Sequence, residues 1–464
     1  MALPAIEARG IAVPTYDRST LQPRIVHIGV GGFHRSHMAL YTDELACETG
    51  SQWGIRGLGL LAGDIRMGEA LAPQDHLYSL TEKGRDATTT RIIGSIVDFA
   101  QASGDASRAE AVIADPAVSI LSLTITEAGY SEPAAGRSNT FDTLAACLDR
   151  RRRELGGPLT ILSCDNLPGN GRAARLATLN AAQRYSPELV QWVSESCTFP
   201  NSMVDRITPM TTATDVDWLH RTYGVSDRWP VVAEPFRQWV IEDSFAAERP
   251  AWERAGVVFT ADVEKWELYK LRMLNAGHSC IAYLGALAGI AYVDEAVGTP
   301  AIHAYLAQLL HLEALPTIEE IAGHPREHYI ASVLDRFANT GVRDQIARLC
   351  IDGSAKFPTF LLPTIQRQLE LDGPIDRATL ALAGWAVYLA ATPIDQQAFD
   401  ADGDTARRFA REARDRPVAF VENAAVFPES LRLNARFRST FERVYRELVA
   451  TGPSATMAGT LAES

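Results

Sequence analysis

The stretch RIVHIGVGG, from Arg24 to Gly32, decides how the chain begins to fold. Its β-branched residues predict a buried strand that ends at the glycines, and the following HRSHMALYTDELACET predicts a helix. A strand, a glycine turn and a helix in this order aim backbone N–H groups and the helix dipole at a phosphate group. The stretch therefore predicts a dinucleotide-binding turn at Gly29 and Gly31, although a tight turn without a ligand explains a lone glycine pair as well.

Two features depart from the usual fingerprint of such turns. His34 stands where the third glycine of G-x-G-x-x-G is expected, and the first acidic candidate for the ribose, Asp64, lies 35 residues after Gly29. An aspartate at this position accepts from a ribose hydroxyl and repels a 2′-phosphate, which favours NAD over NADP, whereas Arg66 acts against that preference. Spacing alone explains Asp64 equally well as a loop residue or a helix N-cap.

The first 260 or so residues alternate short β-branched runs with helical stretches such as FDTLAACLDRRRREL. This alternation predicts an α/β fold with a doubly wound, mostly parallel sheet of Rossmann type. From Glu264 onward the pattern changes to long helical periodicity, so we expect a dinucleotide-binding domain over residues 1–265 and a mainly α-helical domain over 266–464. The last residues, PSATMAGTLAES, are expected to form a frayed tail. The further predicted strands are Trp53 to Leu61, Arg91 to Phe99, Val118 to Thr126 and Leu159 to Leu167.

The composition indicates a globular protein that acts on a small molecule. The 464 residues are 47% hydrophobic and 22% charged, and their formal net charge of −13 argues against a nucleic-acid or anionic-membrane surface. The longest apolar run, Cys280 to Val293, is too short to span a bilayer. The start of the sequence lacks the pattern of a signal peptide, so we expect a cytoplasmic protein.

Cysteine and histidine usage predicts reduced thiols and no metal site. The six cysteines are widely separated and form no C-x-x-C pair, and the ten histidines do not cluster with them at zinc-ligand spacing. Proton chemistry must therefore come from side chains. The only lysines are Lys83, Lys265, Lys270 and Lys356, so the other 40 basic residues are arginine. Arginine stays protonated at any working pH, so such a chain retains lysine where a neutral amine is required, unless chance preserved these four.

One lysine stands in an unusual setting, the stretch KLRMLNAGHSC from Lys270 to Cys280. On an α-helix, at ~100° per residue, Glu267, Asn275 and His278 lie within roughly 140° of Lys270 on one arc. Polar groups buried without partners cost a few kcal/mol each. Taken alone, the stretch is best explained as a satisfied hydrogen-bond cluster that ties the two domains together.

Several blocks together carry a resemblance to a known family. RIVHIGVGGFHRSH, SLTITEAGY, SCDNLPGNG, FPNSMVDRITPM, EPFRQWVIEDSF, KLRMLNAGHS and DGSAKFPTFLLPTI resemble the polyol-specific long-chain dehydrogenases, the mannitol dehydrogenase family. K-x-x-x-x-N-x-x-H is that family's catalytic signature. The resemblance covers nearly the whole chain and implies metal-free oxidation of a polyol by NAD, with mannitol and fructose as the expected pair and the site in a cleft between the domains.

The resemblance also implies roles for individual residues. Lys270 is expected to be the general base, Asn275 and Asn166 to donate to the developing alkoxide, and Glu267 to pass the proton from the lysine to water. Asp205, His278, Arg348 and Lys356 are expected to bind the substrate, and Gly29, Gly31, Phe33, Arg35 and Asp64 to bind the cofactor. Glu127, where the predicted fourth strand ends, is given only a positioning role.

Each of these residues has a structural alternative when its block stands alone. Asn166 fits a loop turn, Asp205 an ion pair with Arg206, and His278 a core contact. Arg348 and Lys356 fit solvated charges at helix ends.

Other functions remain open at this point. A reductase of keto-uronates such as fructuronate shares the same core signature, and its carboxylated substrate calls for an extra arginine, which Arg237 or Arg272 could supply. D-Arabinitol and sorbitol are further candidate substrates. A non-catalytic NAD-binding sensor is the alternative of a different class, although all three catalytic candidates are present. The family resemblance favours a monomer.

Overall fold

The computed structural model describes residues 3–131, 139–154 and 157–460 of the chain. It divides into two compact units, Met1–Glu264 and Lys265–Ser464. Within the described ranges, none of the helices combines the length and the apolar character that a bilayer span requires.

A parallel sheet of six strands forms the centre of the first unit. The strand order is β5-β2-β1-β6-β7-β8, so the direction of winding reverses between β1 and β6. This reversal makes the sheet doubly wound and confirms the predicted Rossmann-type fold. The strands are β1 (Gln22–Ile28), β2 (Trp53–Gly59), β5 (Ile96–Gln101), β6 (Ile120–Leu123), β7 (Leu159–Ser163) and β8 (Cys197–Thr198).

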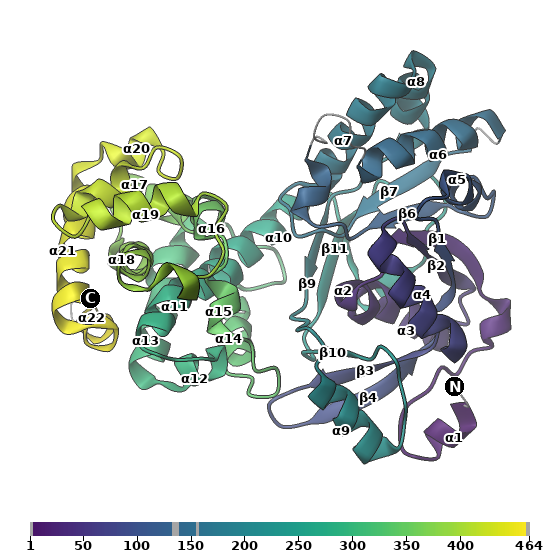
Figure 1. Ribbon diagram of the computed structural model, residues 1–464, viewed down its shortest axis with the longest axis horizontal. Helices are drawn as coiled ribbons and strands as arrows, with labels where there is room; N and C mark the ends of the chain where they lie inside the picture. Colours follow the sequence, from purple (N-terminus) through teal and green to yellow (C-terminus); the bar gives the residue numbers. More distant parts are fainter. Residues whose placement is uncertain (1–2, 132–138, 155–156, 461–464) are drawn as a thin grey trace. The chain divides into compact units, whose positions relative to one another are not determined.

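Both faces of this sheet are covered. Successive apolar side chains of the central strands point to opposite faces, and each face packs against helices. Ile25 of β1 joins a cluster on one face, and its neighbour Val26 joins a cluster on the other. Helices α5, α6, α7 and α8 lie over the face of Val26, and α3 and α4 lie over the face of Ile25 (Figure 1). Their bounds are α3 (Met38–Thr49), α4 (Ile65–Leu71), α5 (Ala106–Ile113), α6 (Thr140–Glu154), α7 (Asn170–Tyr185) and α8 (Pro187–Ser196).

Two three-stranded sheets complete the first unit, in the orders β10-β3-β4 and β12-β11-β9. Their apolar side chains join the same cluster as Ile25, so all three sheets share one core. The remaining elements are α1 (Leu3–Glu7), α2 (Gly32–Ser36), β3 (Tyr78–Lys83), β4 (Thr88–Ile93), β9 (Ser202–Asp205), α9 (Ala213–Tyr223), β10 (Val231–Ala233), β11 (Gln238–Glu242) and β12 (Val258–Thr260).

The stretch predicted as one strand from Arg91 to Phe99 is in fact two strands in different sheets, β4 and β5. The chain turns between them because the Asp43 carboxylate accepts a hydrogen bond from the Gly94 N–H at 2.7 Å. The Ser95 hydroxyl donates to the Ala39 carbonyl at 2.6 Å. Both bonds come from α3, which lies far from this stretch in sequence.

The predicted first helix is likewise divided, at His37 between α2 and α3. His37 has φ −118° and ψ −93°, outside the helical region. Its Nε2 lies 3.0 Å from the Gln238 carbonyl of β11, which holds the ring against that strand. A tertiary contact therefore ends α2 where local sequence predicts continuation.

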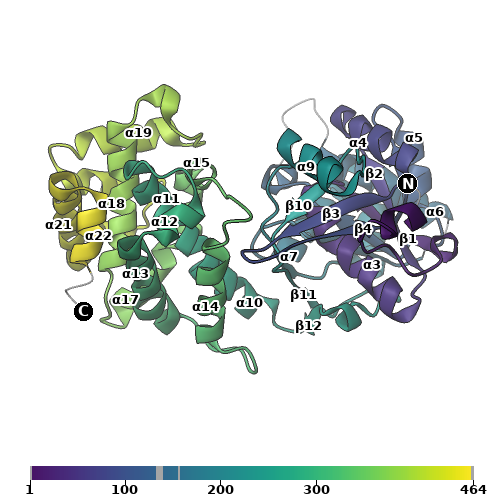
Figure 2. The ribbon, with the colours of Figure 1, turned by 90° about the horizontal axis from the view of Figure 1, so that it is seen from below.

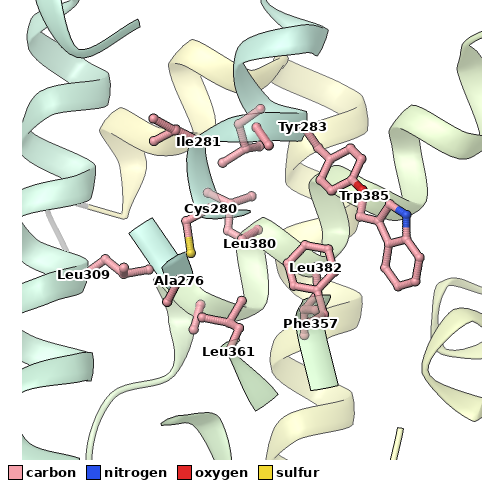
Figure 3. Packing of buried hydrophobic residues seen from close by; sticks show 14 of the residues in the cluster. Ala276, Cys280, Ile281, Tyr283, Leu309, Phe357, Leu361, Leu380, Leu382 and Trp385 are labelled. Atoms are coloured by element: carbon pink, nitrogen blue, oxygen red, sulfur yellow. The ribbon is translucent and has the colours of Figure 1, made fainter. Parts of the chain in front are cut away.

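The second unit is helical, as predicted. Helix α18 lies between α11 and α21 at its centre (Figure 2). Around Cys280 of α11, Phe357 and Trp385 pack with ring centroids 5.1 Å apart (Figure 3). The helices are α10 (Val263–Tyr269), α11 (Ala276–Leu287), α12 (Val293–Gly298), α13 (Pro300–Gln308), α14 (Arg326–Phe337), α15 (Ile346–Leu349), α16 (Gly353–Phe360), α17 (Leu362–Glu370), α18 (Asp376–Ala391), α19 (Gly403–Glu412), α20 (Glu429–Arg432), α21 (Ala435–Thr451) and α22 (Pro453–Gly459).

The predicted frayed tail is wrong for most of its length, since residues 453–459 form α22. Met457 is 0% exposed in the core of the second unit. The Arg377 guanidinium donates to the Thr460 carbonyl at 2.8 Å and fixes the end of this helix. The last four residues, 461–464, lie outside the described part of the chain.

Two segments of the second unit are π-helical, Lys270–Asn275 and Leu309–Ala314. The second of them carries Glu313, which is 0% exposed. Its two carboxylate oxygens accept from the Arg377 and Ala378 N–H groups at 2.8 Å each, in the first turn of α18. Burial raises the pKa of Glu313 to about 7, although these bonds and the Arg377 charge act in the opposite direction.

This raised pKa predicts a pH-dependent stability of the second unit. A raised folded-state pKa stabilises the fold below the ordinary glutamate range and loses that effect as pH rises through about 7. We expect the free energy of unfolding to fall between pH 5 and pH 8, with Glu313 contributing on the order of 3 kcal/mol. Urea unfolding of Glu313→Gln should show a flatter pH dependence over this window. The exposed Glu412→Gln is the control, and an unchanged slope in Glu313→Gln would contradict the assignment.

Candidate active site

The glycine turn after β1 lies at the switch point of the sheet, where β1 and β6 are neighbours. Gly29 has φ +96°, and a Cβ on it would overlap the carbonyl oxygen of Thr124. The Thr124 hydroxyl donates back to the Gly29 carbonyl at 2.7 Å. The chain at position 29 must therefore lack a side chain, because two backbone segments meet there. Ligands of doubly wound sheets bind outside the carboxyl ends of the strands at such a point.

His34, the residue in place of the third glycine, has a packing role beneath this turn. Its ring stacks on His27 of β1 with centroids 3.5 Å apart. Burial lowers the pKa of His27 to about 3 and the pKa of His34 well below its usual range, so both rings are neutral. The flat stacked pair provides the close helix-to-strand packing that a glycine provides elsewhere.

The other predicted cofactor residues lie on the helix after the turn and beyond β2. Arg35 is buried, and its guanidinium donates to the Gly31 carbonyl at 3.2 Å and to the Trp229 carbonyl, so it supports the turn from the interior. Phe33 is half-buried and stacks on His37 at 4.8 Å. Asp64 lies just beyond β2, where its carboxylate accepts from the Leu61 N–H at 2.9 Å. Asp64 therefore binds back to the N-cap residue Leu61 from the third position of a short 3-10 helix, and as the residue before α4 it makes no side-chain N-cap bond.

Asn166 is exposed directly after β7, and buried Asp165 precedes it. The Asp165 carboxylate accepts from the Thr126 N–H and the Tyr130 hydroxyl, each at 2.7 Å. Burial raises the pKa of Asp165, and these hydrogen bonds only partly offset it. The loops that follow β6 and β7 are thereby joined at the carboxyl edge of the sheet, with Glu127 in the first of them.

Thr126 adopts an unusual backbone conformation, with φ +64° and ψ 165°. This region is almost restricted to glycine and costs about 1–3 kcal/mol for other residues. A β-branched side chain has no local reason to be there. The bond to Asp165 and the turn around Gly129, whose N–H donates to the Thr126 carbonyl at 3.0 Å, hold it in place.

Asp205 ends β9 and is buried. The strand is anchored to the end of β7 because the Ser202 hydroxyl donates to the Ser163 carbonyl at 2.6 Å. Arg206, the residue after Asp205, forms a buried ion pair with Glu82. The structural alternative for Asp205 is an ion pair with Arg206, and the ion-pair partner found for the Arg206 guanidinium is Glu82.

In the second unit, the predicted catalytic motif begins in the π-helical segment Lys270–Asn275. A π-turn closes hydrogen bonds between residues five apart, and here the Ala276 N–H donates to the Leu271 carbonyl. Lys270 and Asn275 therefore lie one turn apart on one face, closer in direction than an α-helix would place them. The sequence-based helical angle for Asn275 is wrong for this reason. Lys270 is 8% exposed and Asn275 is half-buried.

The second unit also carries three of the four residues expected to bind substrate, His278, Arg348 and Lys356. The His278 ring stacks on Phe337 at 4.1 Å. Arg348 forms a two-pronged ion pair with buried Asp344, one prong being 2.7 Å from Nε to Oδ1. The Lys356 Nζ donates to the Leu349 carbonyl at 3.1 Å.

The electrostatic couplings of these groups show that they are neighbours. Burial and then the Arg348 charge lower the pKa of Lys356. Burial raises the pKa of Asp344, but Arg348 and His278 outweigh it, so the net pKa lies below the usual range. Asp344 is therefore a shared anionic partner for this group.

Two arginines considered for a carboxylated substrate have partners within their own units. Arg237 is ion-paired with Glu44, and its guanidinium lies 4.9 Å from the Tyr41 ring centroid. Arg272 donates to the Thr364 hydroxyl at 3.4 Å. Across the described residues, no three His, Cys, Asp or Glu side chains are grouped so that they could hold a metal ion.

Family comparison assigns both halves of the chain. Residues 23–254 match the mannitol dehydrogenase Rossmann domain, and residues 262–449 match the mannitol dehydrogenase C-terminal domain. The chain belongs to the mannitol dehydrogenase family. It is therefore an oxidoreductase of the polyol dehydrogenase class, which confirms the family and the enzyme class predicted from the sequence.

Named relatives of the mannitol dehydrogenase family cover almost the entire chain. Mannitol 2-dehydrogenase of Phaeosphaeria nodorum is 37% identical over 97% of this chain and 84% of its own length. The solved mannitol 2-dehydrogenase of Pseudomonas fluorescens, a ternary complex with NAD and D-mannitol, is 36% identical, covers 98% of this chain and 97% of its own, and has a TM-score of 0.86. A D-sorbitol dehydrogenase solved in substrate-free form is 33% identical over 96% of this chain and 97% of its own, with a TM-score of 0.87.

Sequence reasoning missed two buried carboxylates that support predicted site residues, Asp165 in the first unit and Asp344 in the second. Asp165 could have been suspected as an acidic residue at the carboxyl end of a predicted strand. Asp344 lies four residues before Arg348, a spacing that often marks an ion pair near a helix. Neither signal distinguishes such a residue from an ordinary surface acid.

The geometry of the turn predicts a severe effect of Gly29→Ala. We expect it to lower the free energy of unfolding by about 3 kcal/mol or more, because the methyl group meets a backbone carbonyl that cannot move freely. Gly104→Ala is the matched control, since Gly104 has φ +78° and open space around it. That variant should cost about 1 kcal/mol for the backbone conformation alone. Equal losses in urea unfolding of the two variants would refute the close approach.

Proposed function

We propose that this protein is a metal-independent, NAD-dependent polyol dehydrogenase that interconverts mannitol and fructose. The observation that carries the proposal is the π-helical segment with buried Lys270 and, one turn further on, Asn275. A proton acceptor and an amide donor on one face are what the oxidation of an alcohol requires. The named mannitol 2-dehydrogenases at 36–37% identity support the substrate pair.

The first unit fits the proposed cofactor. Gly29 makes the tight turn at the switch point of the sheet, whereas a Cβ on Gly31 would lie near only the Gly29 carbonyl, at 3.7 Å, so a pyrophosphate could approach the backbone at Gly31. Asp64, beyond the end of β2, would accept from the adenosine ribose and repel a 2′-phosphate. When bound, NAD supplies the acceptor for the hydride that leaves the substrate carbon.

The proposed chemistry uses side chains of this chain alone. Lys270 takes the proton of the reacting hydroxyl, for which its amine must be neutral part of the time. Asn166 and Asn275 donate to the oxygen as it gains negative charge, which replaces the polarising effect of a metal ion. Glu267, also buried and one turn before Lys270, passes the proton on to water.

Substrate orientation is assigned to further polar residues of the two units. Asp205 and His278 would bind hydroxyl groups of the polyol chain, and Arg348 and Lys356 would add donors from the second unit. A carboxylated substrate is less favoured, because Arg237 pairs with Glu44 and Arg272 donates to Thr364. Glu127 retains the positioning role expected for it.

Sorbitol is the second candidate substrate. The D-sorbitol dehydrogenase matches this chain with a TM-score of 0.87, so fold similarity does not separate it from mannitol. The preferred substrate and cofactor are identified by initial rates. These are measured with mannitol, sorbitol, D-arabinitol and a uronate-type acid, each with NAD and NADP. We expect kcat/KM to be greatest for mannitol with NAD, and activity with the acid alone would overturn the substrate assignment.

Replacement of Lys270 tests the mechanism. We expect Lys270→Met to lower kcat by 10³-fold or more while the Kd for NADH changes less than about threefold, because the base acts in the chemical step. Lys270→Arg should be equally inactive, since a guanidinium does not give up its proton. Asn166→Ala and Asn275→Ala should each lower kcat by roughly 10²-fold.

Lys265→Met provides the control, because Lys265 is on the same helical stretch but pairs with Glu319 at 3.2 Å. It should keep wild-type turnover, and added chelator should not slow the wild-type enzyme. Strong inhibition by chelator, or full activity in Lys270→Met, would exclude the mechanism. Binding of NADH without turnover of any polyol by the wild type would favour the sensor alternative.

A further inference from the structure

The loop after β6 combines an unfavourable backbone conformation with a location at the switch point. Thr126 is exposed, yet its φ of +64° and ψ of 165° suit glycine rather than a β-branched residue. The same loop touches the glycine turn, because the Thr124 N–H donates to the Ile28 carbonyl at 3.0 Å and the Thr124 hydroxyl to Gly29. A costly conformation that persists at such a place is a reason to look for a function.

The conformation is imposed from outside the loop. The Asp165 carboxylate, at the end of the neighbouring strand β7, accepts from the Thr126 N–H with one oxygen. Its other oxygen accepts from the Tyr130 hydroxyl, which closes the loop over residues 126–130. The Asp165 carbonyl in turn accepts from the Asn170 side chain at 3.1 Å, so the same residue fixes the loop that carries Asn166.

The fold indicates which part of the cofactor meets this loop. A doubly wound sheet consists of two mononucleotide-binding halves. In the first unit, β1, β2 and β5 form the half that carries Asp64, and β6, β7 and β8 form the other half. If Asp64 binds the adenosine ribose, the carboxyl ends of β6 and β7 face the nicotinamide nucleotide.

We propose that Asp165 is a positioning residue that holds Thr126 in its strained conformation and so presents the Thr126–Glu127 edge to the nicotinamide half of NAD. The inference rests on the proposed function, and it adds a determinant of cofactor geometry that is separate from the glycine turn. Tyr130 is the second residue through which Asp165 holds the loop, and Thr126 is the residue presented to the cofactor.

Asp43 offers a closely matched control. It is buried in the same unit and also accepts from one tyrosine hydroxyl, Tyr16 at 2.6 Å, and one backbone N–H, Gly94 at 2.7 Å. Replacement of either aspartate by asparagine therefore removes the same kind of interaction. Of these two aspartates, Asp165 stands at the carboxyl edge of the six-stranded sheet and Asp43 does not.

The test measures the Kd for NADH by fluorescence, together with kcat and KM. We expect Asp165→Asn to raise the Kd about tenfold and to lower kcat, and Tyr130→Phe to raise the Kd about threefold. Asp43→Asn should be less stable to heat but bind NADH within twofold of the wild type. Equal losses of affinity in the two asparagine variants would mean that Asp165 is merely structural and would overturn the inference.

A double variant tests the strain itself. Thr126→Gly removes the cost of the conformation, so the loop depends less on Asp165 to adopt it. We expect the tenfold effect of Asp165→Asn to shrink to about threefold in the Thr126→Gly background. An undiminished effect would overturn the inference. If Asp165→Asn fails to fold, the same comparison is made with Tyr130→Phe in the Thr126→Gly background.

Failure of the proposed function is distinguishable from failure of this inference. If the wild type binds neither NADH nor NADPH, the proposed function falls and this inference with it. If the wild type binds normally and the variants are unaffected, this inference alone is refuted.

Discussion

The contact between Gly29 and Thr124 is the constraint on which the first unit depends. Two backbone segments, from the ends of β1 and β6, lie so close that no side chain fits between them. This contact lies where the winding of the sheet reverses, beside the start of the loop that follows β6. The stacked rings of His27 and His34 pack α2 against β1. The backbone at the glycine turn is thus supported by buried packing that faces away from solvent.

The second unit places an amine and an amide, those of Lys270 and Asn275, on one face of a helical segment. The π-helical segment does so by changing the backbone, so that a spacing of five residues becomes one turn. Asp344 plays the complementary electrostatic part, because it pairs with Arg348 and lies near His278. Each unit therefore carries its own rigid set of polar groups, and each set is supported by a buried aspartate that local sequence does not distinguish.

Much of the fold could be predicted from the sequence because its signals are local. The glycine turn, the strands that became β1, β2, β6 and β7, and the helical second half all follow from periodicity. The errors arose where a distant contact decides the local structure. Asp43 splits one predicted strand by binding Gly94, and the core around Met457 orders a tail of small residues. The π-segment was missed because KLRMLN has the composition of an ordinary α-helix. The candidate site residues were proposed from family likeness, whereas the carboxylates that support them are visible only in three dimensions.

The π-helical segment at Lys270 has a consequence for how the alignment of Lys270 with Asn275 can be lost. A π-segment holds one more residue per turn than the α-helix on either side of it. Deletion of a single residue between Lys270 and Asn275 would restore the regular helix and leave both functional side chains in the chain. Their directions would nevertheless separate, and everything downstream on α11 would rotate with respect to the lysine. The number of residues between Lys270 and Asn275 thus matters to the proposed chemistry as much as their identity.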